Sequence, residues 1–426
     1  IFILTLKNIV MKKITTALTL LIATYSFAQD CSQGRYKEEI FSTISITSDI
    51  QYGSNDDLNG SSKDLFVDIY EGNGDTATNR ALIIMAHGGS FIGGERTGPD
   101  VVTLCQDLAK KGYVVASMSY RLGISGGFFP DSVDATESVF RAVHDGRAAV
   151  RFFRKDFVEN ANSYGIDTSQ IYFAGVSAGG FIGLHLAYLD EQSEIPAYVD
   201  TTGPGLSGGL EGTSGNAGYS SKVKAIVNLQ GALGKKEWLT SGSVPLLSLH
   251  GNNDGVVPHD SSPLYLSGLI YIMDVDGSAA IAAQADAVGV NNCYKQFNGA
   301  GHTPHVGSAA YHDTSMVYIT NFLSQFTCGD PFTCSDAALF LSISDLNINK
   351  AEFSVYPNPA SEFITITSGL VNDYDIDILD LLGKKVYSSH LNNDREMIDV
   401  SAFKSGQYII KLSDETGSVN QIVVIE

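Results

Sequence analysis

The sequence predicts an α/β fold with a mostly parallel sheet flanked by helices, followed by a small all-β sandwich domain. Between about residues 60 and 328, short apolar runs alternate with helix-like runs, which is typical of a parallel sheet covered by helices. From about Ser335 onward, short alternating strands follow one another with turn residues between them, which predicts a sandwich of roughly 75 residues. A chain of 426 residues, 44% of them hydrophobic, is long enough for two folded units.

The first 28 residues are expected to be an upstream leader and a signal peptide, outside the fold. Lys12 and Lys13 precede an apolar stretch that ends in a small-residue site at Ala28, which is typical of a secretory signal. The residues before Met11 are then leader. A membrane anchor is the alternative, but the two lysines interrupt it and neither half is long enough to span a bilayer.

The elements of the α/β unit follow from apolar runs bounded by turn residues. Strands are predicted at residues 65–70, 81–86, 113–120, 171–174, 223–229, 245–249 and 292–297. Helices are predicted at residues 100–111, 135–160, 314–326 and from Gly180 onward. Sheets of this kind place their functional groups beyond the carboxyl ends of the strands, so the segments that follow the strands carry the candidate site.

The stretch GVSAG, residues 175–179, lies between a predicted strand and a predicted helix. This is the pattern of a nucleophile elbow, in which a sharp turn exposes a serine and flanking glycines let the strand and the helix approach each other. Ser177 is therefore the candidate nucleophile. The alternative is an ordinary loop serine, which the flanking strand and helix disfavour.

Two further side chains complete a candidate triad. Asp254 follows the apolar strand at residues 245–249, with Asp276 and Asp286 as weaker substitutes because neither follows such a strand. His302 lies on a Gly-rich loop after the strand at residues 292–297, and it competes with His305 in the same loop. The order serine, acid, histidine along the chain is the order expected of an elbow-type hydrolase.

The segment HGGSF, residues 87–91, follows a predicted buried strand and is the candidate oxyanion loop. The backbone N–H groups of Gly89, Ser90 and Ala178 are the candidate donors to a developing negative charge. Ser90 stands where the related HGGG pattern has its third glycine, and a small residue there still leaves the backbone accessible. His87 is expected to support this loop rather than to carry a proton.

These motifs resemble the α/β-hydrolase superfamily, HGGG-type carboxylesterase/lipase group, over roughly residues 60–328. The resemblance implies a secreted serine carboxylesterase that works through an acyl-enzyme intermediate, with Ser177 as nucleophile, His302 as base and Asp254 as its orienting acid. Acetyl or feruloyl esters of polysaccharide, or other polyesters, are candidate substrates. The alternatives are a secreted peptidase of the prolyl-oligopeptidase-like type and a catalytically inactive adhesion protein.

The C-terminal strands carry a narrower signal. The stretches VYPNPA, DILDLLGKKV and IDVSAFKSGQYIIKL resemble the C-terminal sorting domain of the type IX secretion system of Bacteroidetes. The resemblance implies transit through the periplasm, contact with the type IX machinery, and release to the outer-membrane surface or the medium; a substrate-binding module is the alternative. The expected parts are a leader and signal peptide at residues 1–28, a catalytic domain at 29–328, a linker at 329–350 and the sorting domain at 351–426.

Composition and motifs argue against other classes of partner. The net charge of −20 with few basic clusters disfavours nucleic acid and anionic membranes. There is no dinucleotide fingerprint, phosphate-binding loop or EF-hand loop, so no cofactor is expected. The remaining histidines show no metal-ligand spacing with any cysteine, so no metal is expected either.

The five cysteines lie beyond the expected signal peptide and predict two disulfides and one free thiol, with the pairing left open. Closure of a small loop by Cys328 and Cys334 is one option.

Four other features have either an expected structural role or two alternative roles. His185, eight residues after Ser177, is expected to be a core residue, whereas His144 and Asp145 are expected to face solvent. The Gly/Ser-rich segment at residues 201–221 is either a rim over the acyl pocket or a passive surface loop. Trp238 is expected to pack in the core, with lining of the crevice as the alternative.

Overall fold

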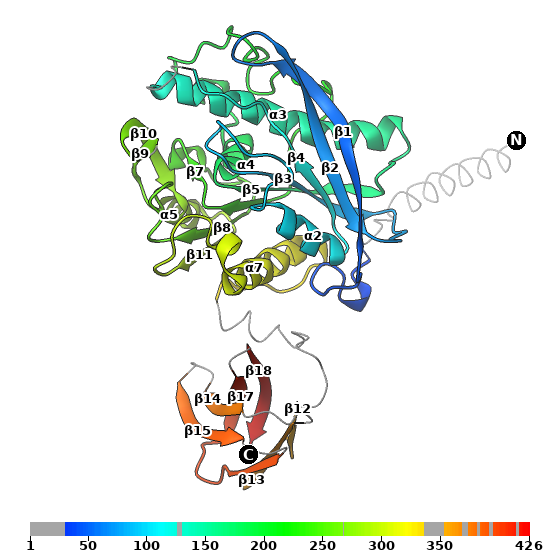
Figure 1. The fold of residues 1–426 in the computed structure, drawn as a ribbon, viewed down its shortest axis with the longest axis vertical. Helices are drawn as coiled ribbons and strands as arrows, with labels where there is room; N and C mark the ends of the chain where they lie inside the picture. Colours follow the sequence, from blue (N-terminus) through cyan, green and yellow to red (C-terminus); the bar gives the residue numbers. More distant parts are fainter. Residues whose placement is uncertain are drawn as a thin grey trace, which may run out of the picture. The chain divides into compact units, whose positions relative to one another are not determined.

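The computed structural model describes residues 30–125, 130–266, 268–335, 353–368, 374–380, 384–391, 395–414 and 417–426. The chain forms two compact units that divide between Cys334 and Ser335 (Figure 1). The expected signal peptide and most of the expected linker lie outside the described residues. Within the described part of the chain, no helix is both long and apolar enough to span a bilayer.

The first unit is built on an eight-stranded sheet in the order β1-β2-β4-β3-β5-β6-β8-β11. Both β1–β2 and β2–β4 are antiparallel pairs, whereas the remaining neighbours run parallel. The strands are β1 (Ile44–Asp56), β2 (Ser62–Gly72), β3 (Arg80–Ala86), β4 (Val114–Met118), β5 (Ile166–Val176), β6 (Ile226–Leu229), β8 (Leu246–Gly251) and β11 (Asn292–Phe297). This topology confirms the predicted fold class.

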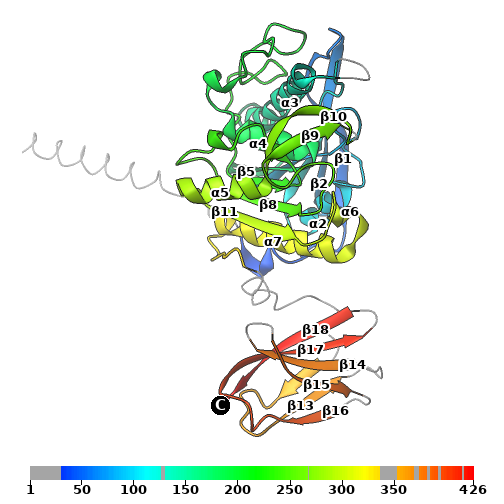
Figure 2. The same cartoon turned by 90° about the vertical axis from the view of Figure 1, so that its left-hand side faces the viewer.

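Helices cover both faces of this sheet (Figures 1 and 2). On one face α3 packs against α4, and on the other α2 packs against α7. The helices are α2 (Val102–Lys110), α3 (Ser132–Glu159), α4 (Ala178–Tyr188), α5 (Ser278–Val288), α6 (Pro304–Gly307) and α7 (Ala309–Thr327). Helix α3 begins at a capping box in which the Asp131 carboxylate accepts the N–H groups of Val133 and Asp134, so two otherwise unpaired donors are satisfied.

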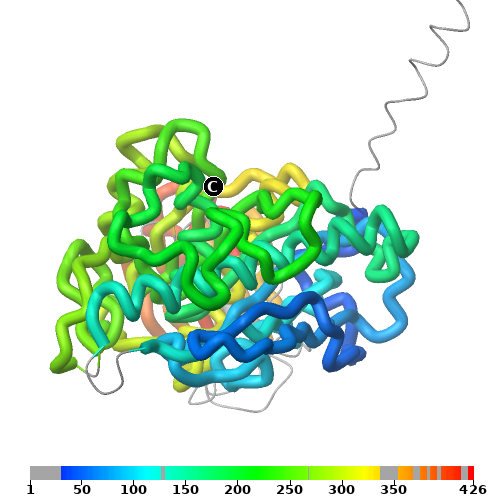
Figure 3. Tube along the Cα trace, turned by 90° about the horizontal axis from the view of Figure 1, so that it is seen from above, coloured from blue at the N-terminus to red at the C-terminus, as the bar shows by residue number. Residues whose placement is uncertain are grey.

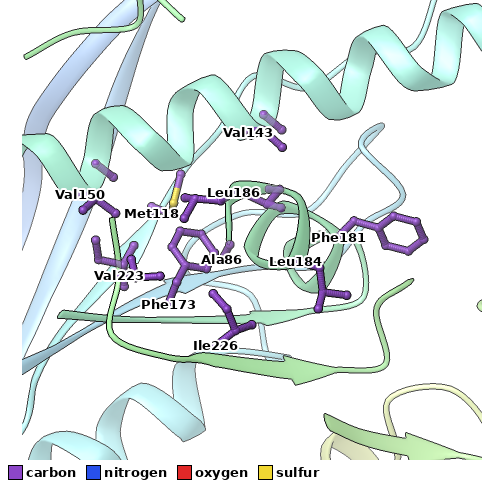
Figure 4. Packing of buried hydrophobic residues seen from close by; sticks show 14 of the residues in the cluster. Ala86, Met118, Val143, Val150, Phe173, Phe181, Leu184, Leu186, Val223 and Ile226 are labelled. Carbon is purple, nitrogen blue, oxygen red and sulfur yellow. The ribbon is translucent and has the colours of Figure 1, made fainter. Parts of the chain in front are cut away.

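Part of the core of the first unit lies between the sheet and the α3–α4 pair. Phe173 of β5 is fully buried beside Leu186 of α4 and Ile226 of β6 (Figure 4). The run of small residues in α4 permits this close packing, because a Cβ on Gly183 would lie 3.0 Å from the Phe173 ring. The position of α4, and hence of the residue before it, is therefore fixed by core packing.

A small second sheet, in the order β7-β10-β9, was not predicted. It consists of β7 (Ala232–Leu233), which lies between β6 and β8 in the sequence, and of β9 (Ser262–Leu266) and β10 (Ile270–Gly277), which are inserted between β8 and α5. The hairpin β9–β10 lies beside the first turn of α3, where the Ser132 hydroxyl donates to the Ile272 carbonyl (Figure 2).

The polar side of α3 is buried, so the prediction that His144 and Asp145 face solvent is wrong. The Asp145 carboxylate is fully buried and accepts from the Arg121 guanidinium at 3.0 Å and from the Ser214 hydroxyl at 2.6 Å. The His144 Nε2–H donates to the Gly209 carbonyl at 2.8 Å. A buried ion pair of this kind requires such additional hydrogen bonds.

The Gly/Ser-rich segment at residues 201–221 is what covers α3 (Figure 3). Arg141 donates to the Pro204 carbonyl at 3.0 Å, Arg147 donates to the Leu210 carbonyl, and Arg151 donates to the Gly215 carbonyl at 3.0 Å. Together with His144, these arginines are spaced three to four residues apart and so share one broad face of the helix. Their periodic charge predicts an exposed face from sequence, which explains the error.

Two disulfides join distant parts of the first unit. Cys31 is bonded to Cys328, and Cys293 of β11 is bonded to Cys334. The small loop closed by Cys328 and Cys334 is therefore wrong, although the expected number of two disulfides is present. Cys105 is the free thiol among the described residues, and it is buried.

The C-terminal unit is all-β, as predicted. One sheet has the order β12-β13-β16 and the other the order β15-β14-β17-β18, and all neighbouring strands are antiparallel. Its core includes Ile364, Ile376, Ile410 and Val423. The strands are β12 (Phe353–Tyr356), β13 (Phe363–Ser368), β14 (Tyr374–Asp380), β15 (Lys385–Leu391), β16 (Arg395–Asp399), β17 (Gly406–Asp414) and β18 (Gly417–Ile425).

Candidate active site

Ser177 occupies a sharp turn between β5 and α4. Its backbone has φ 53° and ψ −115°, a conformation that residues with a side chain rarely adopt. The turn is held by the Ser177 N–H, which donates to the Leu229 carbonyl of β6 at 2.8 Å. A Cβ on Gly175 would lie 2.1 Å from the Gly179 backbone, and one on Gly179 would lie 2.0 Å from the Ala86 carbonyl oxygen. Only glycine fits at both positions.

The three residues of the candidate triad lie in one chain of hydrogen bonds. The Ser177 hydroxyl is 2.9 Å from His302 Nε2, and His302 Nδ1 is 2.6 Å from Asp254 Oδ2. Because a carboxylate only accepts, Nδ1 carries the proton and Nε2 is left to accept from the serine. The side chains follow the carboxyl ends of β5, β8 and β11, so the parallel sheet brings together residues 125 positions apart.

The weaker candidates lie in other hydrogen bonds. His305 Nε2 donates to the Asp100 carbonyl at 3.1 Å. Asp276 accepts from the Lys236 N–H at 2.7 Å, and Asp286 accepts from Asn292 at 2.8 Å. None of the three contacts the Ser177 hydroxyl.

Asp254 is held as a buried carboxylate. Burial by itself would raise its pKa, but hydrogen bonds from His250 and His302 and from the Val256 N–H hold the pKa of Asp254 far below its usual range. His250 is fully buried and lies 3.3 Å from Asp254 Oδ2. Its Nε2 faces two acceptors, the Asp254 carboxylate and the Val257 carbonyl at 3.1 Å, so Nε2 carries the proton and Nδ1 accepts from the Ser278 hydroxyl at 2.8 Å.

His250 was not predicted as part of the site. The signal was its place as the last polar side chain of a buried strand, four residues before the acid, but sequence alone does not distinguish it from other buried histidines.

The HGGSF loop passes beside Ser177. A Cβ on Gly88 would lie 3.2 Å from the Ser177 Cβ. Gly89, Ser90 and Phe91 have φ values of 118°, 54° and 58°, so two residues with side chains adopt a left-handed conformation. Among the hydrogen bonds of the described residues, none has the backbone N–H of Gly89, Ser90 or Ala178 as donor. These N–H groups are thus free to bind an anion.

A cavity of about 350 Å³ opens beside Ser177. Ser90 and Ala178 line it together with side chains that are mostly apolar or aromatic, contributed by α3, α4, Trp238 and the β9–β10 hairpin. Those from α3 and α4 include Ala135, Val139, Phe140 and Phe181, and those from the hairpin are Leu264, Tyr265, Leu266, Tyr271, Ile272, Met273 and Val275, with Asp274 as a charged neighbour.

Trp238 and His185 meet at the wall of this cavity, with ring centroids 5.6 Å apart. His185 is a core residue, as predicted; its Nδ1–H donates to the Phe181 carbonyl at 2.8 Å, and burial lowers its pKa to about 4. Trp238 both packs in the core and lines the cavity, so the expected core role and the alternative lining role apply at the same time. None of the described residues that line the cavity belongs to the segment 201–221, which leaves no support for the rim reading.

In the described part of the chain, no group of three or more His, Cys, Asp or Glu side chains is placed to hold a metal ion.

Two family matches cover most of the two units. Residues 67–239 match the family BD-FAE, and residues 354–426 match the family described as secretion system C-terminal sorting domain. The first match includes Ser177 and the HGGSF loop, whereas Asp254 and His302 lie beyond its end.

Several solved esterases are similar to this chain. A thermophilic esterase from the Planctomycetes species Thermogutta terrifontis, bound to propionate, has 19% identity and a TM-score of 0.46, covering 64% of this chain and 93% of that one. The same esterase phosphorylated by paraoxon has 19% identity and a TM-score of 0.46, over 68% and 96%. A truncated carbohydrate esterase from gut microbiota has 20% identity and a TM-score of 0.44, over 68% and 98%.

A curated relative matches a shorter stretch. An endo-acting ulvan lyase of Formosa agariphila is 34% identical over 79 residues, which is 18% of this chain. The match spans 15% of the length of that lyase.

Proposed function

Because the chain joins a BD-FAE domain to a secretion system C-terminal sorting domain, we propose that it is a serine carboxylesterase exported by the type IX secretion system to the cell surface or the medium. Both predicted family resemblances are confirmed by these matches. The observation that carries the proposed activity is the unbroken hydrogen-bond chain Ser177–His302–Asp254 next to three unused backbone N–H groups.

The proposed reaction has two steps. Ser177 Oγ attacks the ester carbonyl carbon while His302 Nε2 takes its proton, and the carbonyl oxygen becomes an oxyanion that accepts from Gly89, Ser90 and Ala178 N–H. Collapse of this intermediate expels the alcohol, which receives the proton from His302, and leaves Ser177 acylated. In the second step water attacks the acyl carbon while His302 Nε2 takes its proton, and collapse of the second oxyanion releases the acid and returns the proton to Ser177 Oγ. Asp254 holds the imidazole in the required tautomer throughout.

The cavity favours an acyl group larger than acetyl. Its volume of about 350 Å³ lies in the range of small-ligand pockets, and its lining is mainly apolar. Phe140, Phe181 and Trp238 offer ring surfaces to an aromatic acyl group. We therefore favour aromatic acyl esters, with feruloyl esters of polysaccharide as the first candidate; acetyl esters and other polyesters remain substrates to test.

A substrate panel tests this proposal. The mature protein is assayed on p-nitrophenyl acetate, p-nitrophenyl butyrate, methyl ferulate and a prolyl p-nitroanilide. We expect ester hydrolysis, with the highest kcat/KM on the aromatic acyl ester. Ser177→Ala should lower kcat by about 10⁴-fold or more, because its oxygen forms the covalent bond.

The matched control is Ser169→Ala, which removes an exposed serine hydroxyl that donates only to Asp167. It should retain the wild-type kcat. Activity confined to the prolyl amide would support the peptidase alternative, and ester hydrolysis that persists in Ser177→Ala would refute the proposed nucleophile.

A further inference from the structure

The HGGSF loop needs support from outside itself. Three successive positive φ values, at Gly89, Ser90 and Phe91, form a backbone that persists only where neighbouring groups hold it. The loop is also tightly packed at Gly88, because a Cβ there would lie 3.2 Å from both the Asp100 carboxylate and the Ser177 Cβ. The groups that bind the Gly88 peptide therefore decide where the loop points.

Gly88 is bound on both of its backbone polar atoms. Its N–H donates to Asp100 Oδ2 at 2.6 Å. Its carbonyl oxygen lies 2.6 Å from His87 Nδ1 and 3.3 Å from the Tyr120 hydroxyl, which is also 3.0 Å from the His87 carbonyl. A carbonyl only accepts, so His87 Nδ1 donates to the Gly88 oxygen, and the Tyr120 hydroxyl shares its single hydrogen between the two carbonyls, with the His87 oxygen the nearer.

The direction of the Gly88 carbonyl determines the direction of the next N–H. The Gly88–Gly89 peptide bond is trans, since the cis bonds among the described residues are those before Pro357 and Pro359. In a planar trans peptide the C=O and N–H point in opposite directions. Donors that hold the Gly88 oxygen on one side therefore hold the Gly89 N–H toward the other side.

Tyr120 is well placed for this task. It is 4% exposed, its ring stacks on His87 at 4.3 Å, and it meets the edge of Phe91 at 6.0 Å. Burial raises the pKa of Tyr120, so its hydroxyl stays a donor. Asp100 is itself tied to the His302 loop, because His305 donates to its backbone carbonyl at 3.1 Å.

We infer that Asp100 and Tyr120 are positioning residues: Asp100 holds the Gly88 N–H, Tyr120 holds the carbonyls of His87 and Gly88, and together they aim the Gly89 N–H at the oxyanion. The inference rests on the proposed esterase function. Neither residue reaches the substrate directly: Asp100 acts through the Gly88 N–H, and Tyr120 acts through the carbonyls of His87 and Gly88.

An N–H that points in the wrong direction stabilises the transition state less but leaves binding of the ground state unchanged, because the negative charge that it binds develops only during the reaction. Loss of one oxyanion donor costs about 100- to 1000-fold in turnover, and a tilted donor costs less. For Tyr120→Phe and Asp100→Ala we expect kcat to fall by about 10- to 100-fold while KM stays within about twofold.

The experiment compares four variants of the full chain on the best ester substrate of the panel. Tyr120→Phe removes one hydroxyl, and Asp100→Ala removes the acceptor of the Gly88 N–H. Asp100→Asn retains an acceptor oxygen and should recover most of the activity lost in Asp100→Ala. Tyr172→Phe is the control, because it removes a buried tyrosine hydroxyl that contacts Gln170 and Thr327, far along the chain from the loop.

A second readout separates positioning from stability. When a trifluoromethyl ketone binds, Ser177 Oγ adds to its carbonyl carbon, the serine proton passes to His302 Nε2 and the ketone oxygen becomes an oxyanion, so the Ki of this inhibitor reports the oxyanion site. We expect its Ki to rise in Tyr120→Phe by about the same factor as kcat falls. Thermal unfolding of each variant measures the structural effect separately.

The inference is overturned if Tyr120→Phe matches Tyr172→Phe in kcat and in inhibitor Ki. It is also overturned if Tyr120→Phe and Asp100→Ala lower the melting temperature but leave kcat and Ki unchanged. If Asp100→Ala does not fold, Asp100→Asn and Tyr120→Phe decide the matter by the same two readouts. A wild-type protein without ester hydrolysis would refute the proposed function instead, so the two failures are distinguishable.

Discussion

At the scale of single residues, the carboxylate of Asp254 shows how the fold stabilises a negative charge that is buried away from solvent. Its side chain has no exposed surface, yet it accepts hydrogen bonds from two backbone N–H groups and approaches two histidines. These contacts favour the ionised form more than burial disfavours it. His302 is the partly exposed member of the pair, with 18% of its side chain accessible.

We predict that Asp254→Asn lowers kcat by about 10⁴-fold, because an amide in place of the carboxylate no longer fixes the imidazole tautomer. The fold should survive, since the side-chain oxygen can still accept from Val256 and Val257. Steady-state kinetics and circular dichroism of the purified variant check both statements. A loss of less than tenfold would remove Asp254 from the acid role.

Residues of the site differed in how far the sequence could reveal them. Ser177, Asp254 and His302 each follow a strand end and carry a local signal of glycines or turn residues, so their convergence followed from the parallel sheet. Tyr120 and Asp100 have no such local signal, because their roles depend on contacts with Gly88 that only the folded chain creates.

At the scale of elements, the β9–β10 hairpin and the start of α3 define the cavity. The hairpin contributes Tyr265 and Tyr271, which are cross-strand partners with ring centroids 6.0 Å apart. Two short runs rich in Leu, Ile and Tyr on either side of Gly268 are the sequence signal for this hairpin, but the prediction of a mostly parallel sheet did not include it. Strand β1 was missed for another reason: most of its side chains are exposed, and the alternation of Ile44, Ile46, Ile50 and Tyr52 is interrupted at Ser48.

We predict that Ala135→Leu narrows the acyl pocket selectively. Ala135 lies in the first turns of α3 and lines the cavity, and leucine is a good helix former there. We expect kcat/KM for the aromatic acyl ester to fall by about tenfold or more, whereas hydrolysis of p-nitrophenyl acetate stays within about threefold. Equal losses on both esters would show that this cavity does not hold the acyl group.

At the scale of the whole molecule, each of the two units has its own hydrophobic core. Both disulfides lie within the first unit, and so do all the side chains of the candidate site. The division into two units could be predicted because the sequence pattern changes from alternating strands and helices to strands alone. The disulfide pairing was not, since it depends on which chain ends meet in space.

We predict that a chain ending at Ser335 folds and retains kcat/KM within about twofold of the full chain, because a unit with its own core folds independently. Ester hydrolysis and thermal unfolding of the two chains at equal molarity check this. A truncated chain that folds but has lost its activity would show that the C-terminal unit contributes to the site.

The pairing of Cys293 with Cys334 has a mechanical consequence. Tension applied to the chain beyond Ser335 passes through a covalent bond into β11, the edge strand of the main sheet, before it reaches α7. The bond between Cys31 and Cys328 likewise clamps the far end of α7 to the start of the unit. A pull on the C-terminal segment, whether from a transport machine or from a surface attachment, therefore cannot peel α7 away turn by turn, and the load is shared across the sheet instead.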